Sequence, residues 1–214
     1  MKALAPSAMS AERPRTGRPL SFDRAAALDA AMHLFWRHGY EATSITELTR
    51  AMRITPPSLY AAFGDKRRLF HEAVDRYMGG GDAVPALIAA APSARQATRD
   101  LLTAAAIGDT GEDTPPGCLL ASSIVSSSAA AADVRETVAA IRREIEALLR
   151  ARIERDVAAG RLPPGTDAEM LAAHAMAVVQ GMSTLAKDGA GRGKLLRIVE
   201  GAMAGWPGEP SEVA

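Results

Sequence analysis

Residues 43–70 read TSITELTRAMRITPPSLYAAFGDKRRLF, and this stretch decides the fold. Ser44 and Glu47 have the spacing of a capping box, which predicts the start of a short helix. Arg53 and Ile54 form a turn, and the prolines after it open a second short helix at positions where a missing N–H costs nothing. Two short helices joined by a tight turn and followed by a basic helix start have the layout of a helix-turn-helix reader of duplex DNA.

The residues around this motif predict a small helical domain. A helix is expected over residues 23–38, where apolar side chains recur at helical spacing, and Gly39 is expected to end it by adopting a positive φ. Asp65 is expected to cap a further helix that begins at Lys66. The three glycines at 79–81 end that helix and mark the boundary with a second domain.

The composition favours an all-α protein. Of the 214 residues, 48% are apolar but only 4% are aromatic, and β-branched runs are scarce. The net charge is zero, yet residues 1–78 carry an excess of four positive charges and residues 79–214 an excess of four negative ones. This asymmetry fits a nucleic-acid-binding module joined to a body that does not touch DNA, although it also lies within ordinary scatter.

The chain carries few signs of export or membrane insertion. Its single cysteine, Cys118, excludes an intramolecular disulfide, and no apolar run reaches the length of a membrane-spanning helix. Residues 1–21 are rich in Pro, Ser, Ala and Arg, so a disordered basic arm is expected there rather than a targeting peptide. The expected compartment is the cytoplasm, with no membrane partner.

The remainder predicts a second helical domain over 82–206 and a disordered tail over 207–214. Capping-box spacings occur at Ser93 with Gln96 and at Thr166 with Glu169. The expected helices cover 93–107, 133–159, 167–186 and 192–206, with two short helices between 117 and 132. In the longest of them the apolar side chains step by four and three, the pattern of a packed seam: Val134, Val138, Ile141, Ile145 and Leu148.

The segment after the turn has the residue types that base reading needs. Residues 55–58 are small enough to approach base edges deep in the major groove, and a helix N-terminus favours phosphate through its free N–H groups and dipole. Tyr60 and Lys66 come next along the chain, at the right reach for backbone phosphates. Leu59 and Phe63 lie four apart and are expected to face inward.

These residues resemble the DNA-binding head of the TetR family of transcriptional regulators. The run Leu59-Tyr60-Ala61-Ala62-Phe63-Gly64-Asp65-Lys66 matches the family's Leu-Tyr-x-x-Phe-x-x-Lys pattern at every fixed position, and the resemblance covers roughly residues 22–70. It implies a three-helix helix-turn-helix head over 22–78 and a helical effector-binding and dimerisation body over 82–206. It also implies a ligand-responsive repressor that acts as a homodimer on a palindromic operator in double-stranded DNA.

The resemblance also assigns roles to single residues. Arg13, Arg15 and Arg18 of the arm are candidates for an adjacent groove, with a solvated tail as the equal alternative. Phosphate contacts are expected from Ser44, Thr46, Tyr60 and Lys66, and base-edge contacts from Thr55, Pro56 and Ser58.

Two features depart from the family pattern. Arg53 stands where the family usually has glycine, so it either carries backbone strain or is used against phosphate. Pro56 and Pro57 replace polar residues and leave few hydrogen bonds for reading bases, with thymine methyl groups as the remaining contact. The alternative function is therefore a helical adaptor protein with a degenerate DNA-binding head.

The resemblance implies a small, apolar effector and a dimer through helices 133–159 and 167–186, with the seam supplying apolar surface. Candidate effector-pocket or interface residues are Cys118, Met170, His174, Val178 and Met182. For Cys118 a packed core thiol is preferred over a redox or electrophile sensor. No histidine pairs with another or with Cys118 at metal spacing, and no catalytic or cofactor motif is present, so neither an enzyme nor a cofactor is expected.

Overall fold

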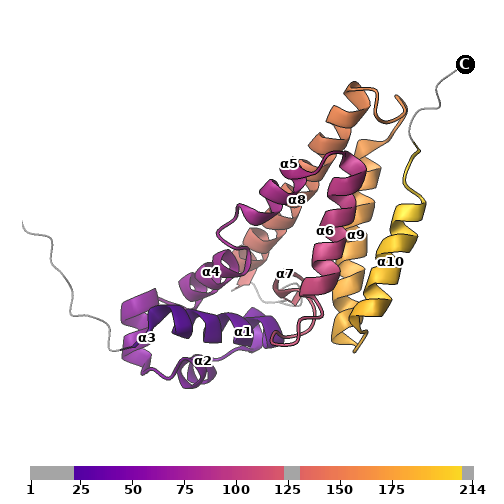
Figure 1. The fold of residues 1–214 in the computed structure, drawn as a ribbon. Coiled ribbons are helices and arrows are strands. Elements are labelled where there is room, and N and C mark those ends of the chain that lie inside the picture. The colour runs from indigo at the N-terminus through magenta and orange to yellow at the C-terminus, as the bar shows by residue number, and fades with distance from the viewer. Residues whose placement is uncertain (1–21, 123–130, 209–214) are drawn as a thin grey trace, which may run out of the picture.

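A computed structural model describes residues 22–122 and 131–208 of the chain. Every regular element in these residues is helical, which confirms the all-α prediction. The expected arm at 1–21, part of the region 117–132 and most of the tail fall outside the described residues. Figure 1 shows a small group of helices at the N-terminal end, the head, from which a longer bundle, the body, extends.

Four helices form the head, and each begins at a side-chain cap. They are α1 (Arg24–Ala42), α2 (Ile45–Met52), α3 (Pro56–Phe63) and α4 (Lys66–Tyr77). The carboxylate of Asp23 accepts from the Ala25 and Ala26 N–H groups, and Ser44 and Glu47 form the complete predicted capping box. Asp65 accepts from the Arg68 N–H, as expected for the cap of α4.

The expected break of the first helix at Gly39 is confirmed, because Gly39 has a non-helical φ of 77° and ψ of 172°. One further helical turn, which was not expected, follows the kink and completes α1 at Ala42. A Cβ atom on Gly39 would lie 3.1 Å from the Ser122 carbonyl oxygen, so the glycine also allows the body to approach closely. The positive φ was predicted from the sequence, whereas the helical turn after Gly39 was not.

Six helices form the described part of the body. They are α5 (Ala83–Ala90), α6 (Ala94–Gly108), α7 (Leu119–Ser122), α8 (Ala132–Ala158), α9 (Ala168–Lys187) and α10 (Arg192–Ala204). The sequence did not predict α5, whose apolar run AVPALIAA has no helical period and no side-chain cap. One of the two short helices expected between 117 and 132 is α7, and the residues for the other lie outside the described ranges.

The predicted start of α9 needs correction. Asp167, not Thr166, caps this helix by accepting from the Met170 N–H at 2.9 Å. The Thr166 hydroxyl is buried and has no hydrogen-bond partner among the residues that the structure describes. Ser93 does cap α6, but the Gln96 side chain bonds to Asp100 at 2.7 Å instead of completing a box.

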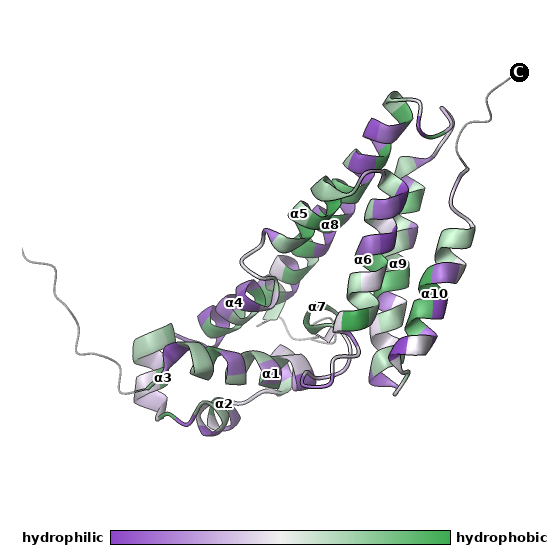
Figure 2. Cartoon of the chain, viewed as in Figure 1, coloured by the Kyte–Doolittle hydropathy of each residue, from purple (hydrophilic) through white to green (hydrophobic). Residues whose placement is uncertain are grey.

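The apolar seam of α8 packs within the protomer. Val134 and Val138 are buried in the cluster that also contains the head core, and Ile145 and Leu148 pack on the body core. We expected this seam to supply the dimer surface. In the protomer Val134 and Val138 are buried, whereas Ile141, Ile145 and Leu148 stay half-buried, so a contribution of the seam to the dimer remains a prediction. Figure 2 shows hydrophobic residues of α8 on the side that faces the other helices.

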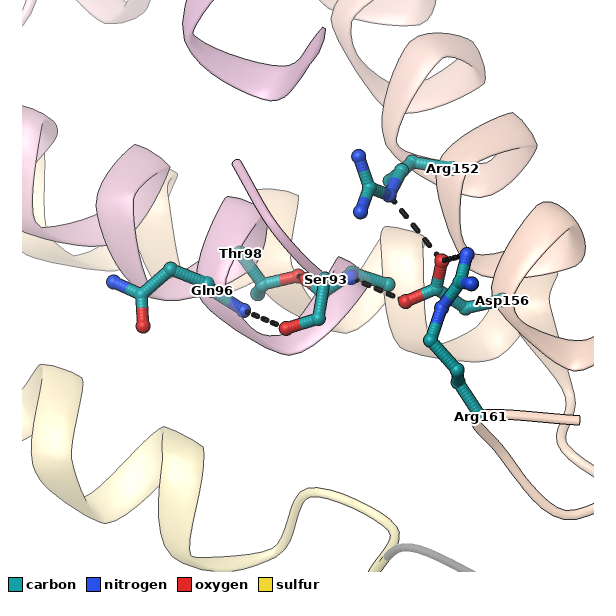
Figure 3. Close-up of polar contacts among 7 residues, drawn as sticks. Ser93, Gln96, Thr98, Arg152, Asp156 and Arg161 are labelled. Carbon is teal, nitrogen blue, oxygen red and sulfur yellow. Dashed lines mark hydrogen bonds and ion pairs between the residues drawn. The ribbon is translucent and has the colours of Figure 1, made fainter. Parts of the chain in front are cut away.

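A buried carboxylate joins the start of α6 to the end of α8 (Figure 3). Asp156 is only 1% exposed and accepts from the Ala94 N–H at 2.6 Å and from Arg161 at 2.7 Å. Arg152, itself 7% exposed, lies 3.4 Å from the same carboxylate. Asp156 therefore ties the start of α6 to the end of α8, with Arg152 buried beside it and Arg161 half exposed.

Candidate nucleic-acid interface

The turn between α2 and α3 has the backbone geometry of a glycine although it carries an arginine. Arg53 has φ 55° and ψ 40°, and it is the one non-glycine residue with positive φ in the described chain. Its N–H donates to the Arg50 carbonyl, and the Ile54 N–H donates to the Thr49 carbonyl at 3.0 Å. Two closing hydrogen bonds therefore hold a strained turn in place, and the Arg53 side chain projects into solvent.

The inner face of α3 is fixed by the head core. Leu59 is 0% exposed and Phe63 is 3% exposed, as the sequence predicted. The cationic guanidinium of Arg24 lies 4.3 Å from the Phe63 ring centroid and forms an ion pair with Glu72 at 2.7 Å. The opposite face of α3 is consequently turned away from the head, and Figure 1 shows α3 at the end of the molecule.

The first turn of α3 lacks the free N–H groups that the sequence led us to expect. Pro56 and Pro57 occupy its first two positions and have no N–H. The Ser58 N–H donates to the Thr55 hydroxyl at 3.4 Å, and the Leu59 N–H donates to the Thr55 carbonyl at 3.0 Å. The predicted phosphate affinity of this helix start through free amides was therefore wrong.

The side chains predicted to contact phosphates differ in their exposure and in whether they already form hydrogen bonds within the protein. Ser44 and Thr46 are exposed at the start of α2, but the Ser44 hydroxyl is already bonded to Glu47. Tyr60 is 49% exposed, and its hydroxyl has no partner in the described chain. The Lys66 ammonium donates to the Glu41 carbonyl at 3.4 Å and lies 4.5 Å from the Tyr40 ring centroid, and partial burial lowers its pKa.

Two aromatic side chains connect the head to the body, and the sequence did not single out either of them. The Trp36 indole N–H donates to the Gly117 carbonyl at 2.5 Å, and the Tyr77 hydroxyl donates to the Cys118 sulfur at 3.3 Å. The Cys118 N–H in turn donates to the Ser183 hydroxyl of α9 at 2.8 Å. The segment before α7 is therefore bonded to α1, α4 and α9 at once.

A buried carboxyl lies beside this junction. Asp109 at the end of α6 is 3% exposed, and its Oδ2 atom has no hydrogen-bond partner among the described residues. Burial raises its pKa to about 7, and the nearby Lys187 opposes that rise. Burial also raises the pKa of the Cys118 thiol, which supports a packed, protonated thiol rather than a reactive thiolate.

The five residues predicted for an effector pocket or an interface do not lie together in one site. Cys118 is buried with the head core, whereas Met182 is buried in the body core. Met170 is 54% exposed, His174 is also exposed and Val178 is half-buried. These three share one outer face of α9 and suit a surface contact better than a ligand cavity.

A different cavity lies where the head meets the body. It has a volume of about 190 Å³ and lies between α4, α5 and α8. Its walls are mainly apolar, with Met78, Val84, Ile141 and Ile145 among them.

No helix in the described ranges is long and apolar enough to cross a membrane. Over the same residues, no group of three or more His, Cys, Asp or Glu side chains is placed to hold a metal ion.

Comparison with known proteins identifies both parts of the chain. Residues 27–73 match the family described as bacterial regulatory proteins, tetR family, and residues 94–190 match the tetracyclin repressor-like C-terminal domain. The chain is 37% identical over 193 residues to the HTH-type transcriptional repressor ComR of Escherichia coli, covering 89% of this chain and 92% of ComR. Over 69 residues it is 45% identical to the repressor BdcR of Escherichia coli, covering 32% of this chain and 34% of BdcR.

Solved structures agree over nearly the whole chain. A cysteine mutant of the TetR family transcriptional regulator CifR, complexed with 26bp double-strand operator DNA, is 42% identical and superimposes with a TM-score of 0.84. That match covers 89% of this chain and 100% of the CifR chain. From its helix-turn-helix head, its helical body and these relatives, the chain belongs to the TetR family of transcriptional regulators.

Proposed function

We propose that this protein is a repressor that binds a palindromic operator in double-stranded DNA as a homodimer. The observation that carries the proposal is the presentation of α3, whose inner face is locked by Leu59 and Phe63 while its outer face is exposed. A helix held in this way can enter a major groove, and two heads on one face of the duplex would lie roughly 34–36 Å apart. The repressor names of ComR and BdcR, and the operator DNA bound to CifR, support the same function.

The proposal divides the chain into a DNA-binding head over 22–78 and an effector-binding and dimerisation body over 82–206. Phosphates are assigned to Ser44, Thr46, Tyr60 and Lys66, with Arg53 projecting from the turn beside them. Base edges are assigned to Thr55, Pro56 and Ser58. Since Tyr60 has a free hydroxyl and Lys66 is partly engaged with Glu41, Tyr60 is ready for a phosphate as it stands, whereas Lys66 must rotate towards one.

The outer face of α9 is the surface we assign to the dimer. Small or apolar residues repeat along it and are exposed in the protomer, together with His174: Met170, Ala173, Ala177 and Gly181. Small residues allow two helices to approach closely, and in a twofold dimer this face would meet its own copy. The exposed side of α8, where Glu136, Arg143 and Arg150 carry charge, would flank that contact.

Effector binding is proposed to act through the head–body junction. A small, apolar effector would prefer one arrangement of head and body, and differential affinity for the two arrangements is what shifts the equilibrium. The cavity between α4, α5 and α8 has apolar walls, and Trp36 and Tyr77 connect the head to Gly117 and Cys118 nearby in the body. Because a repressor must reach the chromosome, the proposal also places the protein in the cytoplasm, as a regulator and not an enzyme.

A mobility-shift assay with the DNA upstream of the gene tests the proposal. Tyr60→Phe and Lys66→Ala should weaken binding to every duplex alike, because phosphate contacts carry no sequence information. Lys66→Ala should also lower the salt dependence of binding, because it removes a positive charge, whereas Tyr60→Phe should leave the salt dependence unchanged. Lys194→Ala, an exposed lysine of α10, is the matched control and should leave binding unchanged. A variant that altered only base preference would contradict the phosphate assignment.

The second candidate is a helical adaptor whose head has lost DNA affinity. It is favoured by the strained Arg53 and by the first turn of α3, which has no free N–H. In the same assay an adaptor would leave every duplex unbound at any salt concentration, while the protein remained folded and dimeric. That result would replace the repressor proposal.

A further inference from the structure

The outer face of α3 is almost devoid of hydrogen-bonding groups. The helix PPSLYAAF contains no Arg, Lys, Asn, Gln, Asp, Glu or His, so none of the usual bidentate readers of guanine, adenine or cytosine is present in it. Its exposed side chains are Pro56, Pro57, Tyr60 and Ala61. Of these, only the Tyr60 hydroxyl is polar.

The hydroxyls at the start of α3 are already engaged with each other. Thr55 and Ser58 share a hydrogen bond at 2.9 Å between their side-chain oxygens, and the Thr55 hydroxyl also accepts from the Ser58 N–H. The two prolines add no N–H, and the Leu59 N–H is bonded to the Thr55 carbonyl. The leading turn of the helix therefore offers apolar ring methylenes and almost no free donor.

We propose that Pro56 and Pro57 read the C5-methyl groups of pyrimidines in the major groove, so that operator recognition depends on thymine methyls. Each base pair presents a distinct pattern there, and the methyl of thymine is its one apolar feature. A 5-methylcytosine carries the same methyl and would be accepted at the same positions. This inference rests on the proposed DNA binding and specifies how the same surface distinguishes sequences.

The expected effect is modest for each base and measurable. Burial of one methylene-sized group is worth about 0.8 kcal/mol, which corresponds to about a four-fold change in affinity for each methyl removed. A phosphate-dominated interface would show no such change, because replacing thymine by uracil leaves the backbone charge intact.

Parallel selections from random duplexes provide the test. The purified full-length protein is offered one pool that contains thymine and another in which deoxyuridine replaces it. The thymine pool should yield a sequence with fixed T positions, and deoxyuridine at those positions should lower affinity about four-fold each. Placing 5-methylcytosine opposite guanine there should restore part of the loss relative to cytosine.

The outcomes separate this inference from the function on which it rests. Enrichment of a sequence whose affinity changes less than two-fold with deoxyuridine would overturn methyl reading and leave DNA binding intact. If no sequence were enriched from either pool, the proposed function would fail and this inference with it. If 7-deazaguanine instead caused the large loss, Arg53 and not the prolines would be the reader.

Variants assign the effect to the prolines. Pro56→Ser and Pro57→Ser, made singly, keep a residue that tolerates the helix start and remove the ring methylenes. In at least one of these two variants, replacing thymine by deoxyuridine should lower the affinity less than two-fold; this loss of affinity is the deoxyuridine penalty. Pro164→Ser, an exposed proline between α8 and α9, is the matched control and should keep the full penalty. Thermal melts of all three establish that the fold is retained, and an unchanged penalty in both head variants would contradict the assignment.

Discussion

The head and the body of this protein are held together in different ways. All four head helices begin at a side-chain cap, and the head core is built from apolar side chains such as Phe35, Leu48 and Leu59. In the body, α5, α8 and α10 begin without a side-chain cap, and a buried carboxylate, Asp156, fixes the start of α6. A local side-chain cap therefore starts every helix of the head, whereas the body combines caps at Ser93 and Asp167 with a buried contact between distant residues.

The largest expected effect comes from removing the buried carboxylate. Asp156→Ala should lower the free energy of unfolding by about 3–5 kcal/mol. The substitution leaves the buried Arg152 without the carboxylate that pairs with it and leaves the Ala94 N–H without its acceptor. Glu154→Ala removes an exposed ion pair with Arg150 and should change the free energy of unfolding by less than about 1 kcal/mol. Urea unfolding at neutral pH measures both. Equal losses would show that the body does not depend on this internal anchor.

A pH effect is expected from Asp109 at the junction of the two regions. Its pKa of about 7 in the folded state lies above its ordinary value, so the folded protein holds a proton that the unfolded chain releases. Stability attributable to this group is present at low pH and falls as pH rises from about 4 to about 7. Asp109→Asn should abolish that fall and stabilise the protein at pH 8 by about 1–3 kcal/mol.

Melting temperatures of wild type and Asp109→Asn across pH 5–8 test this prediction. Asp113→Asn, an exposed carboxyl in the same loop, serves as the control and should follow the wild-type curve. Parallel curves for all three proteins would contradict an ionisation penalty at Asp109.

Cap substitutions compare the two regions directly. Ser44→Ala in the head and Asp167→Ala in the body should each cost about 1 kcal/mol, because each side chain accepts from the first turn of its helix. Thr166→Ala should cost less than about 0.5 kcal/mol, since its hydroxyl is buried without a partner and does not cap α9. Denaturant midpoints rank the three. A larger loss of stability for Thr166→Ala than for Asp167→Ala would mean that Thr166, and not Asp167, caps α9.

The smallest expected effect is a gain in the head. Arg53→Gly should stabilise the protein by up to about 1 kcal/mol, because glycine adopts the positive φ of this turn without strain. Arg50→Gly, inside α2, should instead cost about 1 kcal/mol through lost helix propensity. Thermal unfolding separates the two changes, and a loss on Arg53→Gly would mean that the arginine side chain stabilises the turn.

This division explains which features could be predicted from the sequence. The Ser44–Glu47 box, the turn at Arg53 and the inward Leu59 and Phe63 were all predicted, because their partners lie within a few residues. The candidate phosphate and base-edge residues could be proposed for the same reason, since α2 and α3 contribute nearly all of them.

Features set by distant partners could not be predicted. The close approach of the Ser122 carbonyl to Gly39 depends on a segment far away in the sequence, and the junction contacts of Trp36 and Tyr77 depend on the segment before α7. The seam of α8 was recognised as buried, but the period of an apolar stripe does not say whether its own protomer or a second copy covers it.

Hydrogen–deuterium exchange of the protein with and without its selected operator duplex tests the central claim most directly. The account predicts slower exchange in α2 and α3, over residues 44–66, when the duplex is bound, and little change along the outer face of α9. Protection that left α2 and α3 unchanged and appeared elsewhere would contradict an outward-facing α3 as the part of the molecule that reads DNA.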